Sequence, residues 1–334
     1  MEIRAGHYLT YGFLGVLLSY SLQACSKDTS TNSEQTISLS EIPGSIVFAT
    51  DRNSNWDIYL TTFSGGNHIN LTPNSSSDDS YPIWVNNGNK IIFASNRDGN
   101  FNLYIIHDVA DPENSIEQLT DSDGDDTFPE LSPSGDFLLY FNNGGASTKR
   151  LYKYEFSTGQ STLINEERAP AQIRFVSNNK ALTAQLHGVL MEFDLQAGMT
   201  EKYVYSYDDF DEVGVVTAFD VSKKTGLAYA SLNSLSIRLF YNFWSWDFEA
   251  RSDYYRWTGG PIQNQDIMRC FRVLDIGSPG DYILQSTKGS TGDWKVALGI
   301  GEGAAGISGS KSINGQSGDS LYADWTMVEH ITPF

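Results

Sequence analysis

The residues of this sequence with the clearest chemical potential are the carboxylates of the run Asp121-Ser122-Asp123-Gly124-Asp125-Asp126. Aspartates at alternate positions around a glycine are typical of loops that hold calcium through oxygen ligands. However, no glutamate stands at the closing position that an EF-hand loop requires. A solvated acidic loop is therefore the simpler interpretation. We keep Asp121, Asp123 and Asp125 as calcium candidates and expect no other cofactor.

A second group of candidate residues lies in the aromatic segment from Phe240 to Trp257. Trp244 and Trp246 belong to this segment, and such side chains can stack on sugar rings or contact a protein partner. They can equally pack between neighbouring sheets. Both interpretations stay open, and we take Trp244 and Trp246 as candidate binding residues.

The sequence contains no recognisable catalytic set. It has neither a Gly-x-Ser-x-Gly nucleophile turn nor a His-Glu-x-x-His helix motif. The histidines beyond residue 24 lie in unrelated contexts, at His68, His107, His187 and His330. These observations favour a non-catalytic protein, and enzymatic activity is left open.

Cys25 has a thiol that can carry a lipid. It follows Leu22-Gln23-Ala24, at the end of an apolar run that begins near Tyr8 and is too short for a bilayer span of ~20 residues. These residues resemble the signal peptide and lipobox of bacterial lipoproteins, which implies cleavage before Cys25 and its acylation. An ordinary secretory signal peptide is the alternative. We predict a signal peptide over residues 1–24 and a flexible tether over residues 25–43.

The same resemblance implies a location in the cell envelope. Ser26, rather than aspartate, follows the anchor cysteine, and in enterobacterial lipoproteins this favours the outer membrane. The protein would then face either the periplasm or the outside of the cell. Its net charge of −19 repels phosphate backbones and anionic headgroups, so we expect no nucleic-acid binding and membrane contact through the acyl anchor alone. The expected partner is an envelope protein or a glycan.

The rest of the sequence contains an internal repeat. Asp79-Ser80-Tyr81-Pro82 returns 47 residues later as Asp126-Thr127-Phe128-Pro129, and Thr50-Asp51-Arg52 returns 45 residues later as Ser95-Asn96-Arg97. Each unit has about four short strands with turn-rich connections. One connection, Ser132-Pro133-Ser134-Gly135, has the signature of a type I turn. Four strands repeated at this period predict the blades of a β-propeller.

The repeat resembles that of TolB-type propellers over residues 45–142. The resemblance rests on Asp79-x-x-Pro82-x-Trp84, followed by Gly88 and by Ser95-x-Arg97-x-Gly99. It implies an all-β, six-bladed β-propeller that acts as a non-catalytic module for binding a protein or another ligand. Related blades occur in oligogalacturonate lyases, whose metal-binding histidine cluster cannot be assembled from this sequence. The alternative is a glycan-active enzyme, a polysaccharide lyase or hydrolase, with its site in the propeller channel.

We predict a single propeller domain over residues 44–334. Its first blade lacks an innermost strand, and we expect a C-terminal strand over 321–326 to complete it and close the ring. We expect the Gly- and Ser-rich residues 299–320 to form an irregular excursion. The predicted blades cover residues 45–75 with 320–329, 79–120, 126–164, 168–205, 214–257 and 266–300.

Propellers bind ligands at the mouth of the channel, where the innermost strands and the loops before them converge. Six residues have this position in the predicted blades. We take them as candidate binding residues on this geometric ground: Asp79, Tyr81, Asp126, Phe128, Tyr322 and Asp324.

Overall fold

The computed structural model describes residues 44–326 with gaps, all of which belong to the unit Ser38–Phe334. The predicted signal peptide, Cys25 and the tether lie outside the described residues. Among the described residues, no helix has the length and apolar character needed to cross a membrane. The described residues are 44–63, 67–73, 76–85, 88–144, 150–165, 172–184, 190–195, 201–205, 216–221, 227–232, 235–240, 255–256, 270–274, 281–288, 294–302, 306–312 and 320–326.

All regular elements among the described residues are β-strands, which form six four-stranded antiparallel sheets. Sheet 1 consists, in order, of β24 (Ser320–Thr326), β1 (Ser45–Thr50), β2 (Asp57–Thr62) and β3 (Ile69–Asn70). Sheet 2 consists of β4 (Asp79–Trp84), β5 (Ile91–Ser95), β6 (Asn102–Ile106) and β7 (Ile116–Gln118). Sheet 3 consists of β8 (Asp126–Leu131), β9 (Phe137–Asn142), β10 (Arg150–Glu155) and β11 (Gln160–Asn165).

The later strands follow the same order within their sheets. Sheet 4 consists of β12 (Gln172–Ser177), β13 (Lys180–Ala184), β14 (Leu190–Asp194) and β15 (Glu201–Tyr205). Sheet 5 consists of β16 (Val216–Val221), β17 (Leu227–Leu232), β18 (Leu235–Phe240) and β19 (Tyr255–Arg256). Sheet 6 consists of β20 (Cys270–Leu274), β21 (Asp281–Lys288), β22 (Trp294–Glu302) and β23 (Gly306–Ser312).

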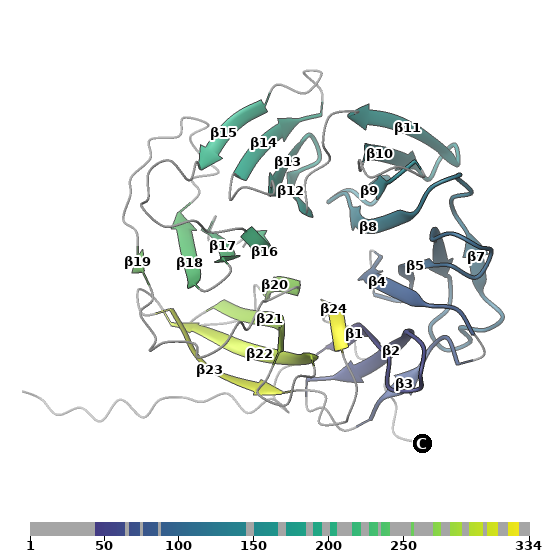
Figure 1. Ribbon diagram of the computed structural model, residues 1–334, viewed down its shortest axis with the longest axis horizontal. Helices are drawn as coiled ribbons and strands as arrows, with labels where there is room; N and C mark the ends of the chain where they lie inside the picture. Colours follow the sequence, from purple (N-terminus) through teal and green to yellow (C-terminus); the bar gives the residue numbers. More distant parts are fainter. Residues whose placement is uncertain are drawn as a thin grey trace, which may run out of the picture. The chain divides into compact units, whose positions relative to one another are not determined.

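The first strands of successive sheets contact one another (Figure 1). The contacts join β4 to β8, β8 to β12, β12 to β16, β16 to β20, β20 to β24 and β24 to β4. In sheet 1, β24 pairs with β1, so that Ile46 lies opposite Trp325 and Val47 opposite Asp324. The first strand of this sheet therefore comes from near the C-terminus.

Residues 299–320 differ from the expected irregular excursion. They contain the end of β22 and all of β23, which pair through Gly301 and Ile307. Strand pairing is made by backbone groups, so a Gly- and Ser-rich segment can pair where a neighbouring strand offers its edge. The prediction of irregular structure was wrong for these strand residues, and the strands of sheet 6 continue to Ser312.

The hydrophobic core lies between neighbouring sheets and follows the alternation of side chains along each strand. In β5, Ile91 and Phe93 belong to the cluster shared with sheet 1, whereas Ile92 and Ala94 belong to the cluster shared with sheet 3. Sheet 2 is therefore buried on both faces, which explains its continuous apolar strand sequence.

Glycines close equivalent turns between the first two strands of sheets 2 and 3. Gly88 and Gly135 have φ angles of 70° and 75°, which L-residues rarely adopt. The N–H of Gly135 donates to the Ser132 carbonyl at 2.9 Å, and that of Gly88 donates to the Val85 carbonyl at the same distance. The hydrogen bond from Gly135 to Ser132 agrees with the turn predicted for Ser132–Gly135.

Candidate functional site

The third residue of the first strand is a strained aromatic residue in both sheet 2 and sheet 3. Tyr81 and Phe128 have φ angles of 54° and 53°, a conformation that costs an L-residue about 1–2 kcal/mol. Each lies where the register of its strand shifts against the next strand. The two half-buried rings lie 4.1 Å apart, centroid to centroid, at an interplanar angle of 41°. The bulges thus bring two predicted binding residues together.

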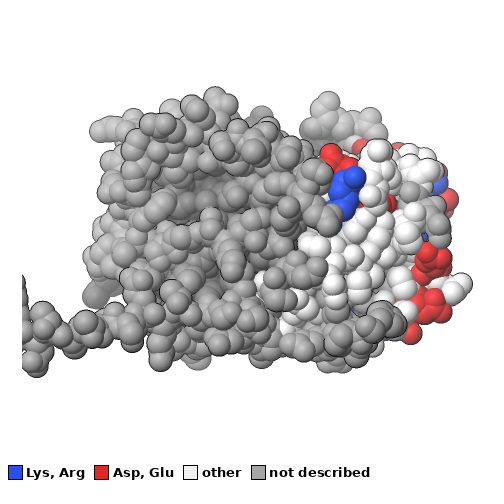
Figure 2. Space-filling view, turned by 90° about the horizontal axis from the view of Figure 1, so that it is seen from below, with Lys and Arg blue, Asp and Glu red and all other residues white. Residues whose placement is uncertain are grey.

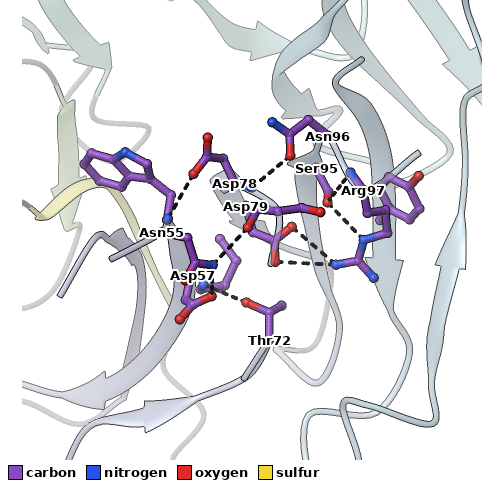
Figure 3. A network of polar contacts seen from close by, with 12 residues as sticks. Asn55, Asp57, Thr72, Asp78, Asp79, Ser95, Asn96 and Arg97 are labelled. Carbon is purple, nitrogen blue, oxygen red and sulfur yellow. Dashed lines mark hydrogen bonds and ion pairs between the residues drawn. The ribbon is translucent and has the colours of Figure 1, made fainter. Parts of the chain in front are cut away.

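A polar network next to this strand joins sheet 2 to sheet 1 (Figure 3). The Trp56 backbone N–H donates to Asp78 Oδ1 at 3.1 Å, and the Asp78 N–H donates to Asn96 Oδ1 at 2.8 Å. The Ile58 N–H donates to Thr72 Oγ1 at 3.0 Å. These hydrogen bonds hold the loop before β4 against β2.

Asp79, at the start of β4, is fully buried and forms an ion pair with Arg97 (Figure 3). Arg97 Nη2 lies 3.3 Å from Oδ1 and 3.4 Å from Oδ2, and Arg97 Nε donates to Ser95 Oγ at 2.9 Å. Burial raises the pKa of Asp79, while Ser95, Arg97 and Thr72 lower it in part. The arginine supplies the positive charge that a buried carboxylate requires.

Arg97 also lies over a pair of aromatic rings. Phe93 and Tyr104 lie directly opposite each other on β5 and β6, with ring centroids 5.9 Å apart. The guanidinium carbon of Arg97 is 5.4 Å from the Phe93 centroid and 4.8 Å from the Tyr104 centroid. Both distances are within the range of cation–π attraction.

Sheet 1 repeats this arrangement of one arginine over two rings. Phe48 and Tyr59 lie opposite each other on β1 and β2. The guanidinium carbon of Arg52 is 5.4 Å from the Phe48 centroid and 4.5 Å from the Tyr59 centroid. In both sheets the arginine stands two residues after the end of the second strand.

Sheet 3 keeps the two rings but has Gly144 at the arginine position, two residues after β9. Tyr140 and Tyr152 lie opposite each other, with centroids 5.6 Å apart and planes inclined by 26°. Within the described part of the chain, no cationic group makes a cation–π contact with these two rings. Sheets 1, 2 and 3 thus share the ring pair, but only sheets 1 and 2 have an arginine at the position two residues after the second strand.

Asp126 is the sheet 3 counterpart of Asp79 and is also fully buried. Asn142 Nδ2 donates to Asp126 Oδ1 at 2.6 Å, whereas Oδ2 has no hydrogen-bond partner among the described residues. Burial raises the pKa of Asp126, and the side chains of Thr120, Asn142 and Ser122 lower it only in part. Asp126 therefore has the same burial as Asp79 without the compensating arginine.

A pocket of about 500 Å³ opens between sheets 2 and 3 and is lined by Asn142, the side chain that donates to Asp126. Its lining includes Tyr140, Tyr152 and Asn142, together with the exposed acidic side chains of Asp121 and Asp123. Acidic groups also mark the edge of the described surface in Figure 2, where the largest visible basic group lies next to an acidic one. The pocket lining thus combines acidic and aromatic side chains.

Asp125, one of the calcium candidates, accepts hydrogen bonds that join sheets 2 and 3. Its Oδ1 accepts a hydrogen bond from the Phe101 N–H at 3.1 Å, and its Oδ2 accepts one from Asn143 Nδ2 at 2.7 Å. It therefore repeats, between sheets 2 and 3, the role of Asp78 between sheets 1 and 2. The described residues contain no cluster of three His, Cys, Asp or Glu side chains suited to a metal ion.

Arg174 on β12 forms ion pairs with residues on both neighbouring first strands. Its Nη1 lies 3.2 Å from Glu130 Oε2 on β8, and its Nε lies 3.4 Å from Asp220 Oδ1 on β16. All three side chains are largely buried, with exposed fractions between 10% and 13%. These ion pairs join three first strands, and sequence reasoning missed them because single charges about one repeat apart carry no local signal.

The other predicted binding residues have different outcomes. Asp79 and Asp126, which were selected as candidates for the mouth of a channel, are both fully buried. Tyr322 and Asp324 lie on β24, of which the structure describes the backbone pairing. Trp244 and Trp246 lie outside the described residues.

Sequence reasoning also missed the difference at Gly144. The repeat offset of 45 residues between Arg52 and Arg97 was recognised, and extending the alignment by 47 residues leads directly to Gly144. The aromatic residues of the three ring pairs were likewise visible in the sequence as members of apolar strands. That one arginine lies over the ring pair in sheets 1 and 2 could be recognised only from the three-dimensional structure.

Solved structures share this fold at low sequence identity. TolB from Acinetobacter baumannii matches with a TM-score of 0.63 and 13% identity, over 84% of this chain and 66% of that chain. Kuenenia stuttgartiensis hydrazine synthase matches with a TM-score of 0.62 and 10% identity, over 85% of this chain and 46% of that chain. A chain of the nidogen/laminin complex matches with a TM-score of 0.60 and 7% identity, over 84% and 98% of the respective chains.

These similarities identify the fold class: the chain contains a TolB-like β-propeller. The predicted all-β propeller class is therefore confirmed. No protein-family model matches the sequence, and no curated protein matches it. The chain spans less than two thirds of the TolB and hydrazine synthase chains, and identities this low concern the fold alone.

Proposed function

We propose that this protein is a non-catalytic binding module of the bacterial envelope, in which a TolB-like propeller holds a protein partner. The observation that carries the proposal is the pair of strained, half-buried rings of Tyr81 and Phe128. An ordinary extended backbone would suffice to bury an aromatic side chain in a sheet. Here two adjacent first strands adopt a costly conformation at the same position, and such strain is concentrated at binding sites.

The two rings are suited to recognition by shape and stacking. Aromatic side chains offer a large contact area at a small loss of side-chain entropy, which makes them frequent anchors in protein interfaces. Because Tyr81 and Phe128 are half-buried, one side of each ring is fixed by the core while part of it stays accessible. A rigid aromatic contact of this kind needs no catalytic group.

The alternative function, a glycan-active enzyme, would draw on Glu130 and Asp220, the carboxylates that Arg174 brings together across the first strands. Glycosidic cleavage needs one carboxylic acid with a raised pKa. Both carboxylates are engaged in ion pairs with the guanidinium of Arg174, at 3.2 Å and 3.4 Å. The ion pairs therefore favour a structural role for this cluster.

The proposal is tested by capturing partners from detergent-solubilised membranes with the full-length protein as bait. We expect the double variant Tyr81→Ala/Phe128→Ala to lose at least one partner that the parent protein retains. Phe156→Ala is the matched control, because Phe156 is also a half-buried aromatic residue but follows β10 and has its ring against Tyr154. An unchanged partner set in the double variant would refute the proposal. Cleavage of a polysaccharide by the purified protein without substitutions would instead support the alternative function, a glycan-active enzyme.

The envelope location depends on Cys25. We expect Cys25→Ala to abolish retention of the protein in the membrane fraction, because acyl chains on Cys25 would be the only attachment. Cys270→Ala is the control, since it removes the other cysteine of the sequence. Unchanged fractionation of Cys25→Ala would contradict acylation.

A further inference from the structure

Sheets 1, 2 and 3 form a series in which one cation position changes. The first two sheets carry Arg52 and Arg97 over their ring pairs, at 4.5–5.4 Å from the ring centroids. Sheet 3 has Gly144 at this position over the rings of Tyr140 and Tyr152. The protein itself therefore shows which group fits such a ring pair: a guanidinium.

The buried carboxylate of sheet 3 is a second, independent observation that points to a cation as the ligand. Asp126 is fully buried and its Oδ2 has no hydrogen-bond partner among the described residues, whereas both oxygens of Asp79 lie within 3.4 Å of Arg97. Asn142, which donates to the other oxygen of Asp126, lines the pocket. Asn142 thus links the lining of the pocket to an incompletely satisfied acidic group.

The pocket has suitable size and charge. Its volume of about 500 Å³ lies in the range of small-ligand sites and exceeds what one arginine side chain needs. Asp121 and Asp123 add negative charge to the lining, opposed by the single positive charge of Arg150. The net charge of −19 attracts basic partners over longer distances.

Close packing of two glycines shapes the wall of the pocket. A Cβ atom at Gly124 would clash with the backbone of Gly144, so the acidic loop lies directly against the turn after β9. A Cβ atom at Gly144 would meet Arg150 Nη1 at 3.5 Å. The guanidinium of Arg150 therefore lies next to Gly144 in the pocket wall, at the point where a longer side chain at position 144 would begin.

We propose that the pocket between sheets 2 and 3 binds the guanidinium of an arginine side chain from a partner protein, placed over Tyr140 and Tyr152 beside Asp126. This inference rests on the proposed function and specifies the chemistry of the partner. The guanidinium takes the position that Arg97 has in sheet 2, with cation–π contacts on the rings and charge-assisted hydrogen bonds to Asp126.

The competing source of this cation is the same chain. Arg150 lines the pocket, and Lys149 precedes it in sequence, outside the described residues. Within the described part of the chain, Arg150 forms no ion pair with Asp126. Substituting both basic residues distinguishes a cation of this chain from a cation of a partner. If Lys149 or Arg150 occupies the pocket, its removal frees the pocket for an added ligand.

The test measures binding of a small probe to the full-length protein in detergent, by calorimetry at low salt. The probe is Nα-acetyl-L-arginine amide, and its neutral control is the corresponding citrulline compound, which keeps the shape without the charge. We expect the arginine probe to bind at least roughly tenfold more tightly than the citrulline compound. Equal affinities, or no binding of either compound, would overturn the proposal.

Two variants assign the binding to this pocket. Tyr152→Leu removes one half-buried ring, and Asp126→Asn removes the buried charge at constant size. We expect each to weaken the arginine probe at least about fivefold, whereas Phe156→Ala leaves binding unchanged. Tyr152 is only half-buried, so Tyr152→Leu is expected to fold normally. Unchanged binding of the arginine probe to this variant would also overturn the proposal.

The variant Lys149→Ala/Arg150→Ala tests the internal cation. We expect its affinity for the probe to remain within about threefold of the parent. A parent protein that binds no probe, combined with a Lys149→Ala/Arg150→Ala variant that binds it, would show that the chain supplies the cation itself. Probe binding needs no partner and uses neither Tyr81 nor Phe128, so its failure is distinguishable from a failure of the partner capture.

Discussion

Sheets 2 and 3 hold the same buried aspartate in different electrostatic surroundings. Asp79 faces the guanidinium of Arg97, whereas Asp126 accepts a hydrogen bond from Asn142 and has a second oxygen without a partner among the described residues. The ring pairs, the register shifts and the aromatic residues with positive φ are common to both sheets. A repeat thus preserves its packing while a single position, Arg97 or Gly144, changes the electrostatic surroundings of the buried aspartate.

The largest expected effect is the loss of the internal cation in sheet 2. Arg97→Ala should lower the free energy of unfolding by about 3 kcal/mol, because it leaves Asp79 buried without a counter-charge and removes two cation–π contacts. Urea denaturation measures the change. Arg150→Ala is the control, since Arg150 is partly exposed and should contribute less than about 0.5 kcal/mol. If Arg97→Ala and Arg150→Ala lowered the free energy of unfolding equally, Arg97 would have no special role as the counter-charge of Asp79.

Neutralising the two aspartates should have effects of opposite sign. Asp79→Asn should destabilise the protein by about 1–2 kcal/mol, because Arg97 loses its partner while its side chain stays 24% exposed. Asp126→Asn should stabilise the protein by about 1 kcal/mol, because it removes an uncompensated buried charge. Thermal unfolding of the two variants at pH 7 measures both. Destabilisation by both substitutions to the same extent would mean that Asp126 has an effective counter-charge.

The pH dependence sharpens the comparison at Asp126. Because burial raises the pKa of Asp126, the folded protein binds the proton of this carboxyl more tightly than the unfolded chain does. The stability from this group is therefore fully present below the ordinary aspartate pKa of 3.8 and is lost as pH rises through the higher folded pKa. The advantage of Asp126→Asn over the parent should be largest at pH 7 and shrink towards pH 4. The variant and the parent share all other titratable groups, so the difference between their free energies of unfolding reports Asp126 alone. A stability advantage of Asp126→Asn that grows on acidification would contradict the prediction.

The sequence allowed the fold class to be predicted because turns and apolar strands recur at a constant period. Asp79-Ser80-Tyr81-Pro82 and its repeat correctly indicated the first strands of sheets 2 and 3. The strands between 299 and 312 escaped prediction, because they are defined by pairing with a neighbour and not by hydrophobic alternation.

The candidate site was less predictable because its members interact across the repeat. Tyr81 and Phe128 were selected by position on the strand, yet their positive φ angles arise from a register shift that composition does not encode. The pocket depends on the relation of Gly144 to Tyr140, Tyr152 and Asp126, which belong to three separate strands. Each of these residues looks ordinary by itself.

The smallest predicted effect concerns a feature that both sheets share, the positive φ of the first-strand aromatic residue. Phe128→Ala and Phe128→Gly lose the same ring contacts with Tyr81 and Phe141, so their difference reports the backbone. At a φ of 53°, glycine should be more stable than alanine by about 1 kcal/mol. Phe137, on β9 with an ordinary strand backbone, should give the opposite order, with glycine less stable by about 0.5–1 kcal/mol. If glycine were also the worse residue at 128, the strain that supports a binding role for this position would be absent, and the same comparison at Tyr81 would show whether the two sheets differ here too.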